Sequence, residues 1–369
     1  MNMKYTVINK GNYKQKYRIK CTLLLVKKIN VLGLFDGISC GMMAFERAGI
    51  PVGRYAAYEI DKYAVQVSRN NYPQIEHCGD VFNGDFRKYK GFDILIGGSP
   101  CTYWSIAKKG RETTPDGAGG KLFMQYVRAL KESGCRYFLY ENNYSIHKNI
   151  KEFISEQLGT EPVMINSALV SAQQRKRCYW TNIPGVTQPE DRNIFVKDIL
   201  ESSQRTIIGE PVVLNDFNSK ARTIKAQYSN TSLANTFRQD GFGATMIAES
   251  VRIGTVGKGG QGERIYSIYG KTVCMSANGG GRGAKTGLYE VDLPDGDYII
   301  RKLTPVEAER CQTLPDNYTC FGIDDMGKKI KISNTQRYKC IGNGWTVDVI
   351  AHILSFMRKY IQGRIKRLH

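Results

Sequence analysis

The sequence predicts an α/β protein with a mostly parallel sheet and a second, smaller domain that is mostly β. Over residues 30–180, short apolar runs alternate with stretches of helical periodicity. Residues 205–300 are instead rich in Gly, Ser, Thr and Asn, with short β-like runs, and helical spacing returns at 345–361. Because strands that alternate with helices are joined by crossover connections, the first region predicts a mostly parallel sheet. A chain of 369 residues suits one large domain and one smaller one.

Each element is predicted from its apolar pattern. Apolar runs predict strands at residues 30–35, 54–59, 92–96 and 137–140. Helical periodicity predicts helices at 42–48, 62–70 and 121–133. In the second region, the β-like runs are 264–268 and 271–275. Ligands of open α/β sheets bind beyond the carboxyl ends of the strands, so the residues that follow each strand are candidates for a site.

The charge of the chain favours a polyanionic partner. The 53 Lys and Arg residues outnumber the 34 Asp and Glu residues, which gives a net charge of +19. Such an excess favours phosphate binding, because each neutralised phosphate releases counterions. A lysine-rich proteome without a specific partner explains the same excess. Residues 1–28 carry Lys and Arg but no acid. They fit either a basic arm on phosphates or an extension that is disordered or stems from an upstream start.

The composition argues against metal and membrane sites. The ten Cys residues form no C-x-x-C pair and the chain has four His residues, so zinc and iron–sulfur spacings are absent from the sequence. Reduced thiols in the cytoplasm are the simple interpretation. No apolar run approaches the roughly 20 residues that span a bilayer. We expect a cytoplasmic protein with no metal and no membrane partner.

Three motifs at strand ends describe a candidate adenosine site. The first, at residues 34–41, has glycines that let backbone N–H groups approach a ligand, although a tight structural turn explains it equally well. Glu59 can accept hydrogen bonds from ribose hydroxyls, whereas Asp61 suits a helix N-cap. Asp80 can accept from an adenine amino group while Val81 packs on the ring, with a surface turn as the alternative. The G-x-G-x-x-G of a dinucleotide site is missing.

A candidate nucleophile stands in the run Gly-Gly-Ser-Pro-Cys at residues 97–101, after the third predicted strand. A lone cysteine is commonly buried and structural, but Cys101 stands on a loop at the sheet edge, where it is presented. A thiolate is a strong nucleophile once positive charge lowers its pKa. Residues 102–120 are polar and Gly-rich with Lys108, Lys109 and Arg111, and we interpret them as a mobile lid over a phosphate backbone.

Glu141, Arg175 and Arg177 are the candidates for acting together with the thiol. Glu141 comes just past the fourth predicted strand, where an acid can act on a ring nitrogen. Positions 173, 175 and 177 point the same way in a strand, so the two arginines can hold a carbonyl and a phosphate. A solvated basic strand is the alternative.

Taken in order, these motifs resemble those of the C5-cytosine DNA methyltransferases. The matching residues are Phe35-Asp36-Gly37, Glu59, Gly79-Asp80, Pro100-Cys101, Glu141-Asn142, Gln173-x-Arg175-x-Arg177, Arg301-Lys302-Leu303-Thr304-Pro305 with Glu309, and Gly342-Asn343. The resemblance covers about residues 29–361. It implies a Rossmann-like, S-adenosylmethionine-dependent methyltransferase domain and a mostly β target recognition domain. The implied order is a basic extension at 1–28, the catalytic domain at 29–195, the recognition domain and hinge at 196–334, and a C-terminal helix at 335–369 that returns to the catalytic domain.

The resemblance also implies a chemistry. Cys101 would attack C6 of a cytosine that has flipped out of the duplex, because the attack cannot occur inside a base stack. Glu141 would contact N3 and the exocyclic amine, while Arg175 and Arg177 would steady the ring oxygen and Glu141. C5 would then take the methyl group. The residues implied for the S-adenosylmethionine pocket are Phe35, Asp36, Gly37, Ile38, Glu59, Ile60, Asp80, Val81, Pro100, Leu122, Asn343 and Trp345.

Residues 257–266 and 276–289 resemble the recognition domain of the bacterial Hha-type methyltransferases, which act on GCGC. By this likeness Gln261 would fill the hole left by the flipped base, and Arg264 would bind a guanine edge in the major groove. The residues implied for DNA binding are Ser105, Lys108, Lys109, Gln261, Arg264, Gly279 and Gly280. We therefore expect double-stranded DNA as the partner, a monomeric protein, and a bacterial or phage source.

Four positions depart from the family pattern. Thr102 follows the nucleophile where Gln or Asn is usual, Asn143 replaces a Val, and Asp36 replaces a small residue. Trp345 is like that of the animal de novo branch. None of these departures removes a chemical group that the reaction needs. Two alternatives stay open: a tRNA cytosine-5 methyltransferase, against which the Gly-rich segment 257–289 argues, and a catalytically silent DNA-binding protein, against which the intact catalytic set argues.

Overall fold

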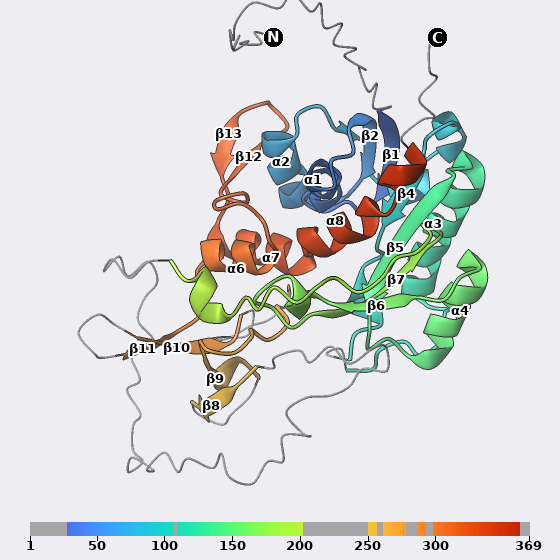
Figure 1. The fold of residues 1–369 in the computed structure, drawn as a ribbon. Coiled ribbons are helices and arrows are strands. Elements are labelled where there is room, and N and C mark those ends of the chain that lie inside the picture. Colours follow the sequence, from blue (N-terminus) through green and yellow to red (C-terminus); the bar gives the residue numbers. More distant parts are fainter. Residues whose placement is uncertain are drawn as a thin grey trace, which may run out of the picture.

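The computed structural model describes residues 28–106, 109–201, 250–256, 261–275, 277, 283, 286–292 and 298–361. Its centre is a seven-stranded sheet in the order β3-β2-β1-β4-β5-β7-β6 (Figure 1). The strands are β1 Ile29–Leu34, β2 Val52–Tyr58, β3 Glu76–His77, β4 Ile94–Gly97, β5 Tyr137–Asn143, β6 Val163–Asn166 and β7 Lys176–Thr181. Strands β1 to β5 pair in parallel, whereas β7 pairs antiparallel with β5 and β6. The predicted mostly parallel sheet is confirmed.

The helices that were predicted between the strands are confirmed as α1, α2 and α3. The described α-helices are α1 Cys40–Arg47, α2 Lys62–Asn71, α3 Ala118–Ser133, α4 Lys148–Leu158, α6 Pro305–Cys311, α7 Asn334–Asn343, α8 Val347–Ser355 and α9 Arg358–Ile361. The short 3-10 helices are η1 Val81–Asn83, η2 Phe86–Tyr89, η3 Cys101–Tyr103, η4 Ser167–Leu169, η5 Val196–Ile199 and η6 Gln261–Glu263. The helical segment expected at 345–361 divides into α8 and α9, and Trp345 lies in the turn before α8.

Helices cover both faces of the central sheet because its strands are apolar on both sides (Figure 1). Val31 and Tyr55 belong to the core cluster that contains α1, α2 and α8. Leu32 and Ala56, which are their chain neighbours, belong to the cluster that contains α3 and α4. Successive strand residues point to opposite faces, so the continuous apolar runs of the sequence give a sheet that is buried on both sides.

The strand order reverses between β1 and β4. From β1 the chain moves outward to β2 and β3 and then returns to β4 on the other side of β1. In open α/β sheets, the region beyond the carboxyl ends of the two strands at such a switch point is where ligands bind. The loop after β1, with Phe35 to Gly37, and the loop after β4, with Cys101, leave the sheet at this place.

Strand β5 is longer than the sequence predicts. It extends through Asn143, so Glu141 lies within a paired strand and not just past one. Pairing with the antiparallel β7 sets Asn143 opposite Arg177 and Glu141 opposite Tyr179. Side chains on diagonal positions of such a pair share one face of the sheet. The reversed strand therefore brings Arg177 within reach of Glu141.

A second sheet of four strands has the order β11-β10-β9-β8. Its strands are β8 Arg252–Thr255, β9 Arg264–Ser267, β10 Leu288–Asp292 and β11 Tyr298–Arg301, and a separate hairpin comprises β12 Phe321–Ile323 and β13 Lys329–Lys331. The β-like run at 264–268 is confirmed as β9. The strand expected at 271–275 is wrong, because Thr272 makes one bridge to Gln173 and bonds its backbone to Ala172 and Gln174 of the large body.

Within the described ranges, no helix has the length and apolar character needed to cross a membrane. No group of three or more His, Cys, Asp or Glu side chains in these ranges is placed to hold a metal ion.

Candidate active site

The loop after β4 carries Cys101 at the first position of η3 and leaves it half-buried. The buried hydroxyl of Ser99 lies 2.6 Å from the hydroxyl of Tyr140. The side-chain amide of Asn142 donates to the carbonyl of Ser99 at 3.3 Å and to the Tyr140 hydroxyl at 3.2 Å. Because Tyr140 and Asn142 belong to β5, these bonds fix the loop against the neighbouring strand, and the thiol is presented at the sheet edge.

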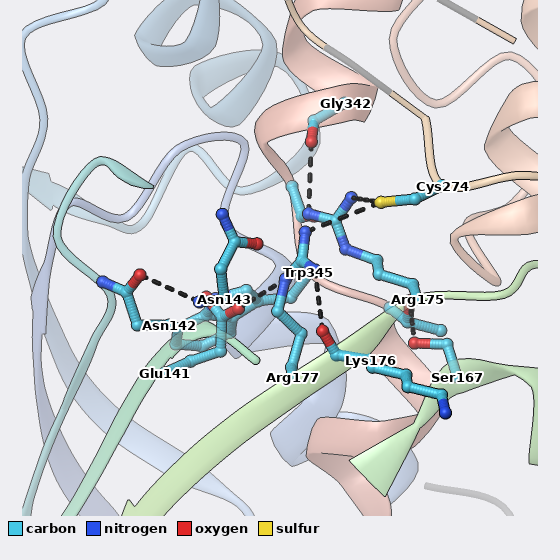
Figure 2. A network of polar contacts seen from close by, with 12 residues as sticks. Glu141, Asn142, Asn143, Ser167, Arg175, Lys176, Arg177, Cys274, Gly342 and Trp345 are labelled. Carbon is cyan, nitrogen blue, oxygen red and sulfur yellow. Dashed lines mark hydrogen bonds and ion pairs between the residues drawn. The ribbon is translucent and has the colours of Figure 1, made fainter. Parts of the chain in front are cut away.

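Glu141 is held by two side chains from distant parts of the chain (Figure 2). The Nε atom of Arg177 lies 2.9 Å from Glu141 Oε1, and Trp345 Nε1 donates to Glu141 Oε2 at 3.0 Å. The side chains of Arg177 and Glu141 are 9% and 12% exposed, so the pair is largely shielded from water and its orientation is tightly set. Trp345 was predicted to line the donor pocket, and the structure places its indole N–H on Glu141.

Gly98 brings the nucleophile loop next to this carboxylate. A Cβ atom at Gly98 would lie 2.9 Å from both the carbonyl and the Oε2 atom of Glu141, and 3.5 Å from Trp345 Nε1. A side chain at this position would displace the carboxylate or the loop, so the close approach requires glycine.

Arg175 and Arg177 are 5% and 8% exposed, so the alternative of a solvated basic strand is wrong. Arg175 donates from Nη2 to the carbonyls of Gly342 and Gly344, each at 3.2 Å. It therefore holds the turn between α7 and α8, which carries Trp345. Of the two arginines that the resemblance implied would steady the ring oxygen and Glu141, Arg175 reaches Glu141 only through this turn.

Arg177 keeps its positive charge at the centre of the site. Burial alone lowers the pKa of Arg177, but Cys274, Glu141 and Cys101 raise it above its ordinary value. The guanidinium therefore stays charged where it pairs with Glu141.

Cys274 joins the group, although no sequence signal pointed to it. Its Sγ atom lies 3.8 Å from Arg175 Nη1 and 3.8 Å from Arg177 Nη2. It stands 97 residues beyond Arg177, in an irregular segment, so no local spacing links it to the arginines. Burial by surrounding atoms raises the pKa of Cys274, but Arg177 and Arg175 outweigh it and the net pKa is lowered. The residue nevertheless stays exposed to solvent.

The loop that follows the nucleophile is anchored at its base. Trp104 is fully buried and donates from Nε1 to Glu112 Oε2 at 3.1 Å. Glu112 also accepts from the N–H groups of Ala118 and Gly119, the first residues of α3, at 3.0 and 3.1 Å. These bonds hold the base of the loop against the start of α3. The mobile lid over residues 102–120 stays a prediction.

The residues of this loop that were expected to bind DNA differ in their exposure to solvent. Ser105 is half-buried and Lys109 is exposed. Lys108 lies outside the described residues. Arg111 donates to the carbonyl of Ser145 at 2.6 Å, so it is part of the anchor.

The turn after β1 folds onto the end of β2. Phe35 and Ser39 adopt left-handed backbone conformations, with φ of 56° and 61°, which strain a residue that is not glycine. Gly37 donates its N–H to Glu59 Oε2 at 2.8 Å. Glu59 Oε1 accepts from the N–H groups of Ile60 and Asp61 at 2.8 and 2.7 Å. Burial raises the pKa of Glu59.

Asp61 caps α2 by accepting from the N–H groups of Tyr63 and Ala64, so the predicted cap is confirmed. Asp80 caps η1 by accepting from Phe82 N–H at 3.0 Å through one carboxylate oxygen. The turn role considered for Asp80 is present, and its second oxygen is compatible with an adenine amino group as well.

Asp36 lies under the same turn in a chain of hydrogen bonds. It accepts from the hydroxyl of Ser39 at 2.6 Å and from the hydroxyl of Tyr55. The Ser39 hydroxyl lies 2.6 Å from that of Ser68, which lies 3.4 Å from His77 Nε2. Burial is the largest influence on the Asp36 carboxyl and raises its pKa to about 6. Both oxygens of Asp36 thus bind the scaffold.

The side chains around this turn fit an adenosine group that carries an amino acid. Ile60 is 75% exposed beside Glu59 and offers an apolar surface. Phe35 and Leu122 are partly buried on one apolar cluster, and Asn343 is exposed at the end of α7. Backbone amides, a carboxylate and apolar surface at adjacent strand ends are the groups that such a ligand needs. Of the remaining predicted pocket residues, Val81 and Ile38 are buried and Pro100 is exposed.

Two of the residues expected to read DNA lie in the second sheet or next to it. Arg264 begins β9 and is half-buried, and its Nε atom is shielded from solvent without a hydrogen-bond partner among the described residues. Gln261 begins η6. Gly279 and Gly280 lie outside the described residues.

The fold and the site define a class: Rossmann-like methyltransferases that carry a cysteine on the loop next to a clamped carboxylate, and a β-rich second body. The chain belongs to the C-5 cytosine-specific DNA methylase family, whose model matches residues 29–359. The resemblance inferred from the motifs is thereby confirmed.

Individual relatives agree with the family. The chain is 29% identical over 347 residues to the type II methyltransferase M.HhaI of Haemophilus parahaemolyticus. The alignment covers 88% of this chain and 93% of that protein. It is 27% identical over 316 residues to the orphan methyltransferase M.Rho11sI of Bacillus phage rho11s, covering 73% of this chain and 62% of that protein. The solved structure of the methyltransferase EhMeth of Entamoeba histolytica has the same fold, with a TM-score of 0.61, 14% identity, and coverage of 90% of this chain and 99% of that chain.

Proposed function

We propose that Cys101 is the nucleophile with which this DNA cytosine-5 methyltransferase acts on a cytosine in double-stranded DNA, and that Glu141 is the carboxylate that binds the base. The observation that carries the proposal is the clamp on Glu141. Arg177 at 2.9 Å and Trp345 at 3.0 Å hold the carboxylate beside the Cys101 loop. A catalytic group whose position is set before the substrate arrives does not lose free energy by reorganising during the reaction.

The geometry supports a sequence of covalent steps. The thiolate of Cys101 forms a bond to C6 of the cytosine. The electrons of the C5–C6 double bond move toward N3, where Glu141 contacts the ring, and C5 becomes nucleophilic. After C5 has taken the methyl group it loses its proton, the C6–S bond breaks, and the thiolate is restored. The base is out of the duplex throughout, because neither ring face is open to attack within a stack.

S-adenosylmethionine supplies the methyl group as an electrophile on a positively charged sulfur. We assign the turn at Phe35 and Gly37 to its amino acid part and Glu59 to the ribose. Ile60, Asp80 and Val81 are assigned to the adenine. Pro100, Leu122 and Asn343 complete this assignment, whereas Asp36 and Trp345 act through the turn and through Glu141.

The proposal that double-stranded DNA is the partner rests on the charge of the chain and on the second sheet. The excess of 53 Lys and Arg over 34 Asp and Glu supports a polyanion, and Lys109 is exposed on the loop next to the nucleophile. We assign target reading to Arg264, with GCGC as the candidate site, and binding as a monomer. The division at about residues 195 and 335 into catalytic and recognition parts belongs to the same proposal. Bacterial and phage relatives support a cytoplasmic place of action.

A covalent trap tests the proposal. A duplex with 5-fluorocytosine at the target position carries fluorine in place of the C5 proton. The fluorine cannot leave as the proton does, so the C6–S bond does not break and the adduct persists. We expect a denaturation-stable adduct with the wild-type protein and S-adenosylmethionine, and none with Cys101→Ser, which should still bind the duplex. An adduct in Cys101→Ser would show that another residue is the nucleophile.

The substrate is tested in the same assay. Unmodified duplex and tRNA are added as competitors, and duplex should suppress the adduct whereas tRNA should not. Bisulfite sequencing of plasmid DNA then identifies the target, and protection confined to GCGC would support the role of Arg264. Suppression by tRNA alone would favour the tRNA alternative instead.

A further inference from the structure

The contacts around Glu141 form a closed ring that passes through Cys274 (Figure 2). Glu141 pairs with Arg177, whose Nη2 atom lies 3.8 Å from Cys274 Sγ. The same sulfur lies 3.8 Å from Nη1 of Arg175, whose other nitrogen donates to the Gly344 carbonyl at 3.2 Å. The next residue, Trp345, donates back to Glu141 at 3.0 Å.

Cys274 is the member of this ring that belongs to the segment after β9. The other members come from β5, from residues 175 and 177 just before and within the start of β7, and from the turn between α7 and α8. The backbone of this segment is itself fastened to the large body, because Thr272 donates to the Ala172 carbonyl at 2.6 Å and accepts from Gln174 N–H at 2.9 Å. The sulfur is thus the point at which a segment leading into the second sheet contacts Arg177, the partner of Glu141.

The charges of the ring do not balance without the sulfur. Arg175 and Arg177 bring two positive charges into a site where both are more than nine-tenths buried, and Glu141 brings one negative charge. A buried guanidinium whose charge is not compensated is strongly unfavourable. A thiolate at Cys274 compensates the second guanidinium, and both guanidinium groups are directed at its sulfur (Figure 2). The lowered pKa of Cys274 agrees with this geometry.

We propose that Cys274 is a positioning residue for methyl transfer: as a thiolate it holds Arg175 and Arg177 in the orientation that clamps Glu141, and so couples the recognition segment to the catalytic carboxylate. The inference rests on the proposed role of Glu141. It assigns no contact of Cys274 with the reacting base.

Kinetics of matched variants test the coupling. Single-turnover methyl transfer is measured with saturating duplex and S-adenosylmethionine for the wild type, Cys274→Ala, Cys274→Ser and Cys320→Ala. Alanine removes the acceptor, and we expect it to slow the transfer about tenfold or more while the KM values for the duplex and the donor stay within about twofold. Serine restores an acceptor without the charge and should recover part of the rate. Cys320 is half-buried ahead of β12 and serves as the control, with an unchanged rate.

Thiol chemistry gives a second measurement that does not depend on turnover. The thiolate of Cys274 displaces iodide from iodoacetamide and forms a thioether, which mass spectrometry detects residue by residue. In the Cys101→Ser background at pH 7, we expect Cys274 to react at least about tenfold faster than Cys320, because neighbouring guanidiniums increase the thiolate fraction. This measurement also covers the case in which Cys274→Ala fails to fold.

The outcomes separate the inference from the function. A wild type that methylates DNA while Cys274→Ala turns over at the wild-type rate overturns the coupling and leaves the function in place. Equal rates of alkylation at Cys274 and Cys320 would contradict the proposal that Cys274 is a thiolate. A wild type that neither methylates DNA nor forms the 5-fluorocytosine adduct overturns the proposed function, and this inference with it.

Discussion

Asp36 keeps a carboxyl group beneath the β1–α1 turn, where burial raises its pKa to about 6. The hydroxyl donors Ser39 and Tyr55 lower this pKa but do not offset the burial, and the charge of Glu59 raises it further. In an unfolded chain the pKa of Asp is about 3.9. The folded protein therefore binds more protons than the unfolded chain between about pH 4 and pH 6, and stability falls as pH rises through this window.

Replacing Asp36 by Asn should remove this part of the pH dependence. We expect the group to lower the free energy of unfolding of the wild type by about 1–3 kcal/mol between about pH 4 and pH 6, and the variant to lack that loss. Urea unfolding at several pH values measures the difference. Asp85→Asn is the matched control, because Asp85 pairs with Arg87 at the surface and its pKa is lowered. Identical pH slopes for Asp36→Asn and the wild type would mean that the folded protein does not hold Asp36 protonated.

Some residue positions could be predicted because they follow from local rules. Cys101 and Asp61 follow predicted strands within a few residues, and the carboxyl ends of neighbouring strands meet at one edge. The contacts of Trp345 and Cys274 could not be predicted, because they join residues 204 and 97 positions apart and depend on how separate elements pack.

The loop between η3 and α3 shows how an element is held by one carboxylate. Glu112 binds the indole of Trp104 and the first two N–H groups of α3, with distances of 3.0 to 3.1 Å. Those N–H groups have no partner within the helix, so a side chain must satisfy them. A cap that lies inside a polar, Gly-rich stretch gives no periodic signal, and for this reason the sequence did not predict this one.

Glu112→Ala should therefore destabilise the protein by about 1–3 kcal/mol, since it removes a helix cap and leaves the buried indole N–H without its acceptor. Chemical denaturation measures this loss. Glu152→Ala is the control: Glu152 pairs with Lys148 on the exposed side of α4, and its removal should cost less than about 1 kcal/mol. A loss in Glu112→Ala no larger than in the control would contradict the anchoring.

The apolar patterns predicted the strands correctly where the apolar runs are long. They failed where tertiary contacts decide which backbone groups pair. The four strands predicted in the first region are present, because burial on both faces requires continuous apolar sequence. Strand β5 continues past its apolar run through Glu141 to Asn143 because the antiparallel β7 supplies partners for its backbone. The run at 271–275 has strand-like composition, but its backbone bonds are taken up by the large body.

At the scale of the whole molecule, Lys271 joins the segment after β9 to the large body. Its side chain is completely buried and its ammonium group donates to the carbonyls of Ala168, Ser171 and Ile194 at 2.7, 3.3 and 2.6 Å. A third core cluster continues this connection, because residues of β9 and β10 pack there with residues of α6 and α7. The second sheet is therefore joined to the first body both by apolar packing and by the buried, hydrogen-bonded ammonium group of Lys271.

Lys271→Met keeps the length of the side chain but removes the ammonium group, and three buried carbonyls lose their donor. We expect a loss of about 2–4 kcal/mol in the free energy of unfolding, because hydrogen bonds to a charged group contribute about 1.5–3 kcal/mol each while the desolvation of the ammonium group is relieved. This loss of stability should mainly weaken the connection between the second sheet and the first body. Calorimetry should then resolve two transitions where the wild type unfolds in one.

Lys131→Met controls for the loss of a lysine, since Lys131 is exposed in the last turn of α3, and it should leave the unfolding profile unchanged. If Lys271→Met keeps a single transition that shifts as a whole, the apolar cluster alone holds the two bodies together. Recognition and catalysis would then be coupled through packing and not through this charge. A separation into two transitions would instead mean that the caged ammonium group makes the molecule one cooperative unit, which is the condition under which a segment after β9 can set the position of Glu141.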